Sequence, residues 1–114
     1  MTTFEKIVNA IKQFNLPHEP DVYTGDSSDG WFTYNYADDY GANFADDAPQ
    51  AVIVSVQVHL FLPLKKNFIA TKNKVRNALF NQGFTFPDIT VLTEDKWRHI
   101  VFSCDIIEED ALEF

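Results

Sequence analysis

Few residues of this chain have the types and spacing that catalysis or metal binding requires. His59, His99 and Asp105 fall on the polar faces of two predicted strands, so a site of two histidines and a carboxylate is conceivable if those strands are neighbours. Their spacing is not a zinc signature, and exposed histidines are common in strands, so we expect no bound metal. With Ser103, these residues are the only candidates for a pocket of converging polar groups.

The single cysteine is not expected to act as a nucleophile. Cys104 lies between Phe102 and Ile106 on the apolar face of a predicted strand, where a small buried side chain is typical. Burial raises the pKa of a thiol and leaves little thiolate, so we expect an inert residue. A lone cysteine also forms no intramolecular disulfide and fits a reducing compartment. We therefore expect no catalytic residues and no cofactor.

The aspartates could suggest a calcium site. Asp26 and Asp29 lie in one turn-rich segment, and two pairs lie in an acidic connection, at 38–39 and 46–47. These residues lack the alternating ligand spacing and the distal glutamate of a helix-flanked calcium loop. We interpret them as a solvated loop whose charges keep a hydrophobic protein soluble.

Length and composition predict one soluble domain, residues 1–114. The 114 residues are 46% hydrophobic, which is too much for a disordered chain. The net charge of −8 disfavours general nucleic-acid binding, because a phosphate backbone repels such a protein. No stretch approaches the roughly 20 apolar residues of a membrane span, and the first residues lack the features of a signal peptide. We expect an intracellular protein with no membrane partner.

Hydrophobic periodicity places the elements. Thr2 and Glu5 match a capping box, so a helix is predicted over 3–15, and a second helix over 65–82 ends at Gly83. Strands are predicted at 21–24, 31–37, 51–62, 84–93 and 97–107. Short turns between strands favour antiparallel pairing. The fold class is therefore α+β, a two-layer sandwich of a mainly antiparallel four- to five-stranded sheet with two helices.

Charge is segregated along the chain. Residues 1–50 carry a net charge of −7, residues 51–92 carry +4, and residues 93–114 carry −5. This pattern suits either an internally balanced surface or a head-to-tail contact between a basic helix and a neighbour's acidic loop. Aromatic residues are abundant, and Trp31, Tyr40, Phe44 and Trp97 fall on polar faces or in connections, as at protein–protein contacts.

Several segments resemble tail completion, or tail terminator, proteins of siphophages and prophages of Gram-positive hosts. The resemblance covers about 31–107 and is carried by NYADD (35–39), ADD (45–47), VQVHLF (56–61), NALFNQGF (77–84) and RHIVF (98–102). It implies a structural protein without catalytic motifs. Members cap the head-proximal end of the tail tube as a ring, commonly of six subunits, and join it to the head connector.

The resemblance implies partners and a location. The partners are other copies of the chain, the tail tube protein and head–tail connector proteins, and the location is the virion tail or neck, assembled in the host cytoplasm. An isolated subunit is monomeric if ring closure requires the tube as template. Candidate contact residues are Asp38, Asp39, Tyr40, Phe44, Asp46, Asp47, Lys72 and Arg76. Alternatives are a head-closure or adaptor protein of the phage neck, or a small-ligand-binding α+β domain.

Overall fold

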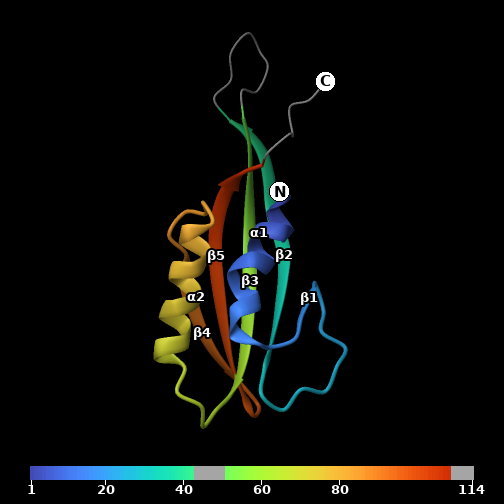
Figure 1. The fold of residues 1–114 in the computed structure, drawn as a ribbon, viewed down its shortest axis with the longest axis vertical. Coiled ribbons are helices and arrows are strands. Elements are labelled where there is room, and N and C mark those ends of the chain that lie inside the picture. Colours follow the sequence, from blue (N-terminus) through green and yellow to red (C-terminus); the bar gives the residue numbers. More distant parts are fainter. Residues whose placement is uncertain (43–50, 109–114) are drawn as a thin grey trace.

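The chain folds as a two-layer α+β structure, which confirms the predicted fold class (Figure 1). The structure is a computed structural model, and it describes residues 1–42 and 51–108. One five-stranded sheet has the order β1-β2-β3-β5-β4, and both helices lie on one of its faces. The helices are α1 (Thr3–Ile11) and α2 (Ile69–Asn81), and the strands are β1 (His18–Pro20), β2 (Trp31–Ala42), β3 (Ala51–Pro63), β4 (Asp88–Glu94) and β5 (Trp97–Ile107).

Helix α1 begins at the predicted capping box. The Thr2 hydroxyl accepts from the Glu5 amide, and the Glu5 carboxylate accepts from the Thr2 amide. Ile7 and Ile11 bury the apolar side of the helix against the sheet. The α-helix ends before the predicted residue 15, because Lys12–Phe14 tighten into a 3₁₀ turn that Asn15 closes in the left-handed conformation.

The core lies between the helices and the three long strands. Val58 pairs with Tyr34 on one side and with Phe102 on the other, and all three side chains are buried. The predicted alternation of β3 is confirmed, with its even positions in the core. This strand is the central strand of the sheet, so it has a hydrogen-bonded neighbour on each side over most of its length.

Both elements that follow β3 begin later than predicted. Helix α2 starts at Ile69 rather than at residue 65, because Lys65 and Lys66 form a turn after β3. Strand β4 starts at Asp88 rather than at residue 84, because Phe84 turns into the core and Pro87 has no amide hydrogen for a ladder. The predicted cap of α2 is confirmed, since Gly83 has a φ of +102°.

The N-terminal edge of the sheet also differs from the prediction. The strand expected at 21–24 is wrong, because the chain pairs earlier, as β1, and Asp21 then takes a positive φ of 64°. Strand β1 runs parallel to β2, and the other three pairings are antiparallel. Strand β2 continues past the predicted residue 37 to Ala42, because it stays paired with β3 after a register shift between Tyr36 and Asp38.

Strands β2 and β3 extend beyond both helices at one end of the molecule (Figure 1). The principal extents are 54 × 23 × 23 Å, and the radius of gyration of 15.4 Å exceeds the roughly 13 Å expected of a compact chain of this length. We call the paired segment Tyr36–Ala42 of β2 and its partner residues in β3 the arm. Among the described residues, no helix is both long enough and apolar enough to span a membrane.

Candidate interaction surface

The sheet face opposite the helices carries a cluster of aromatic rings. Trp31 of β2 stacks on Phe61 of β3 and on Tyr23, with ring centroids 4.8 and 5.1 Å apart, and meets the edge of Trp97 of β5 at 4.6 Å. These strand residues share a face because Trp31 pairs with Phe61 and both strands place alternate residues on each side. Neither α1 nor α2 covers this face (Figure 1), so within the described part of the chain the half-buried rings form the floor of an uncovered surface. We call it the aromatic face.

A hydrogen-bonded chain of polar side chains crosses the aromatic face over four strands. His59 Nδ1 lies 2.7 Å from His99 Nε2, and His59 Nε2 lies 3.0 Å from Asn35 Oδ1. His99 Nδ1 lies 3.0 Å from a carboxylate oxygen of Glu94. The ring of His99 also stacks on Phe61 at 4.2 Å, which fixes the plane of the imidazole. The chain therefore has the order Asn35–His59–His99–Glu94.

These contacts determine where the protons sit. Asn35 Nδ2 donates to the carbonyl of Tyr36, so its Oδ1 faces His59 and accepts from Nε2. The carboxylate of Glu94 can only accept, so His99 Nδ1 carries a hydrogen. All three contacts are satisfied by three ring hydrogens: one on His59 Nε2, one on His99 Nδ1 and one between His59 Nδ1 and His99 Nε2. A fourth hydrogen would set two N–H groups against each other and break the link between the rings.

Burial lowers the pKa of His59, and the positive charge of His99 lowers it further. Glu94 opposes this effect but is farther away along the chain of contacts. The neutral form of His59 is therefore favoured in the folded protein. Sequence patterns brought the two histidines to one face, but nothing in them identified Asn35 and Glu94 as their partners.

The aromatic face does not assemble the metal site that was conceivable from the sequence. His59 and His99 meet, but Asp105 lies farther along β5 and accepts a hydrogen bond from the Ser55 hydroxyl at 2.6 Å. Ser103 pairs with Gln57 and stands between these two places. Within residues 1–42 and 51–108, no three histidine, cysteine or carboxylate side chains gather as metal ligands.

Cys104 is buried in the core, as predicted. Desolvation and the neighbouring Asp105 raise the pKa of its thiol to about 12. The thiol is therefore protonated at neutral pH, and the side chain packs as a small apolar group.

The predicted contact residues fall on two separate parts of the fold. Asp38, Asp39 and Tyr40 are exposed on the arm. Lys72 and Arg76 lie on α2, where Arg76 Nε donates to the carbonyl of Pro87 and its guanidinium covers a phenyl ring. Within one molecule the structure therefore does not bring the two sets together. The remaining predicted contacts, Phe44, Asp46 and Asp47, lie outside the described residues.

The surface has several open depressions. A largely apolar one, of about 510 Å³, lies at the end of the sheet between Leu64, Lys65 and Trp97. Another, of about 270 Å³, includes Ser103 and Asp105 but neither histidine. The polar groups that were candidates for a ligand site are thus divided between two places on the sheet.

Comparison of the sequence with models of known protein families finds no match, and comparison with curated proteins also finds none.

Proposed function

We propose that this chain is a tail completion (tail terminator) subunit of a siphophage or prophage. It acts as a structural protein, forming a ring that caps the head-proximal end of the tail tube and joins it to the head connector. Its place is the tail or neck of the virion, after assembly in the host cytoplasm. The proposal begins from the resemblance of residues 31–107 to that family.

The observation that carries the proposal is the division of the sheet into one covered and one uncovered face. The helices cover one face, while the other carries the half-buried rings around Trp31 and continues into the arm. Large aromatic side chains at an uncovered surface favour contact with other macromolecules. A protein that works by docking needs such surfaces and does not need a deep pocket.

Charge on the arm also suits this role. Asp38 and Asp39 are exposed there, and the whole chain carries −8. An acidic surface facing the lumen lets DNA pass without the counterion release that drives phosphate binding. The alternative of a small-ligand-binding domain is less well supported, because Asp105 bonds Ser55 rather than joining the histidine pair.

Removal of charge from the arm tests the proposal. We expect the double variant Asp38→Asn/Asp39→Asn to fold normally and to reduce the yield of infectious particles from a phage that carries it. The matched control is Asp26→Asn/Asp29→Asn, which removes the same charge from the exposed 21–30 segment. Equal infectivity of wild type and both variants would contradict a role of the arm in assembly.

A further inference from the structure

One edge of the sheet is an unprotected strand. Among the described residues, strand β4 pairs only with β5 and lies last in the sheet. Val91 is 41% and Leu92 42% exposed, on opposite faces of the strand. Between its terminal carboxylates, Asp88 and Glu94, it contains no charge and no proline that would block further pairing. Such an edge favours the addition of another strand.

The opposite edge has a free segment of the same length. Strand β1 pairs with β2 only at Phe32, Thr33 and Tyr34. In the described part of the chain, Tyr36–Ala42 therefore has β3 on one side and no strand on the other. This segment has seven residues, as has β4.

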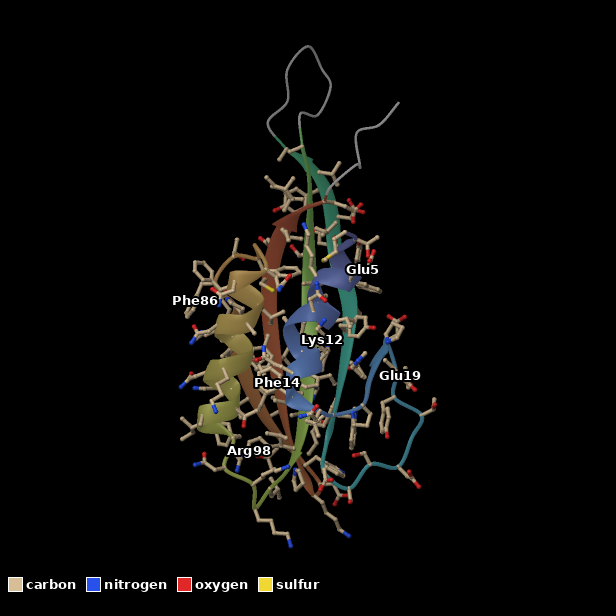
Figure 2. All side chains as sticks on the ribbon, in the orientation of Figure 1. Glu5, Lys12, Phe14, Glu19, Phe86 and Arg98 are labelled. Atoms are coloured by element: carbon tan, nitrogen blue, oxygen red, sulfur yellow. The ribbon has the colours of Figure 1, made fainter. Side chains whose placement is uncertain are left out.

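The charges beside these edges are opposite in sign. Helix α2, on the β4 side, carries Lys72, Lys74 and Arg76 and has no acidic residue, and these outnumber the two carboxylates of β4. The β1–β2 side carries Glu5, Glu19, Asp38 and Asp39 against Lys6 and Lys12, and Figure 2 shows Glu5 and Glu19 on the far side of the molecule from Phe86, which lies beside α2. Pairing of β4 with another β4 would set two basic α2 helices side by side. Pairing of β4 with β2 instead joins a basic flank to an acidic one.

We propose that β4 of one copy pairs with the Tyr36–Ala42 edge of a second copy. Within one chain β4 runs antiparallel to β2, because the order β2-β3-β5-β4 contains three successive antiparallel pairings. A rotation about the ring axis gives every copy of β2 the same sense along that axis, so the contact between β4 and the next β2 is also antiparallel. The extra contact therefore continues the sheet with the helices of both copies on the same side.

Matching the two seven-residue segments end to end sets the register. Leu92 then lies opposite Asp38, and both side chains belong to the aromatic face. Val91 lies opposite Asp39, on the side of the sheet where α2 carries its basic residues. No carboxylate faces another carboxylate directly, and Asp39 approaches the cations of the neighbouring α2.

The stagger of this contact suits a closed ring. Leu92 pairs with His99 of β5, which pairs with Phe61 of β3. Asp38 pairs with Ser55 of β3, which lies six residues from Phe61 along that strand. Six residues span about 20 Å along a strand, and the four strand spacings from one β2 to the next, through β3, β5 and β4, span about 19 Å across the sheet. Strands inclined by about 45° to the ring axis absorb that stagger, which is the upper end of the roughly 35–45° found in closed barrels. The strand pairing specifies how copies join in the proposed ring. It rests on the proposed function only because that function requires copies of the chain to associate.

Cysteine cross-linking tests the pairing. We expect a mixture of the Leu92→Cys and Asp38→Cys variants to form a disulfide-linked heterodimer under mild oxidation, with and without tail tube protein. Neither variant alone should form a cross-linked dimer, and the native Cys104 does not interfere because it is buried. Dimers of Leu92→Cys alone would show pairing of β4 with itself and overturn the proposal, as would the absence of the heterodimer.

A proline variant provides a second test. A two-residue turn, Asp95–Lys96, joins β4 to β5, so the flanking residues Glu94 and Trp97 form a hydrogen-bonded pair. Because amide direction alternates along a strand, the amide of Leu92 points to β5 and the amide of Val91 points to the free edge. Val91→Pro should therefore keep the fold and weaken self-association by about tenfold or more, while Val91→Thr keeps the amide and associates normally. Unchanged association of Val91→Pro would overturn the proposal. If rings form on the tube but neither the cross-link nor the effect of Val91→Pro is seen, the strand pairing is wrong and the proposed function stands. If the cross-link forms but the protein does not bind the tube, the strand pairing stands and the proposed function is contradicted.

Discussion

The histidine pair of the aromatic face provides a quantitative prediction. Replacement of His59, His99 or both by glutamine defines a double-mutant cycle for the link between the rings. A hydrogen bond between neutral groups contributes about 0.5–1.5 kcal/mol to stability. We expect a coupling of about 1 kcal/mol in the free energy of unfolding at about pH 7.5.

Acid should remove this coupling. Because burial and His99 lower the pKa of folded His59, the unfolded chain takes up a proton first as the pH falls. The contribution of the pair is complete above about pH 6.5, the pKa of an unperturbed histidine, and is lost as the pH falls through the lower pKa of the folded state. One proton changes stability by at most about 1.4 kcal/mol per pH unit, and solvent screening of the half-buried ring reduces this slope.

Urea denaturation of the four proteins of the cycle, at about pH 7.5 and about pH 5, measures the effect. His18→Gln is the control, because His18 lies on β1, outside the chain of contacts, and should leave the coupling unchanged. Nitrogen NMR of the imidazoles should also show His59 with its hydrogen on Nε2 at neutral pH. A coupling below about 0.5 kcal/mol, or one that grows in acid, would refute the hydrogen-bond reasoning.

Three further results are expected. Trp31→Ala should lower the free energy of unfolding by about 2–4 kcal/mol in urea denaturation, because three ring contacts are lost; a loss under about 0.5 kcal/mol would show that the stack contributes little. Gly30→Ala should cost about 2 kcal/mol or more, because Gly30 has a φ of +117° and a Cβ there would lie 2.3 Å from the Phe61 carbonyl; an unchanged urea midpoint would contradict this. Cys104 should react with a thiol reagent only as fast as the protein unfolds, and rapid labelling of the native protein would contradict its burial.

Elements with strong periodicity were predictable from the sequence. The alternation of β3 identified its buried face, and the capping box at Thr2 placed the start of α1. The boundaries that failed depend on tertiary pairing. The acidic residues Asp38 and Asp39 look like a loop, yet they lie in a strand because β3 continues beside them.

The surface was only partly predictable. Alternation places His59 and His99 on polar faces, but their contact depends on β3 and β5 being neighbours, which local sequence does not specify. The role of Glu94 depends on the hairpin that pairs it with Trp97, two residue pairs from the pair of Leu92 and His99. The exposure of β4 likewise follows from its place at the end of the sheet order.

The central claim is that this chain works by docking against copies of itself and other parts of a virion. Light scattering of the purified protein, alone and after addition of the tail tube protein of the same phage, tests it most directly. We predict a closed oligomer of defined mass, at the latest when the tube protein is present. A chain that stays monomeric in both samples at every accessible concentration and never binds the tube would contradict the claim.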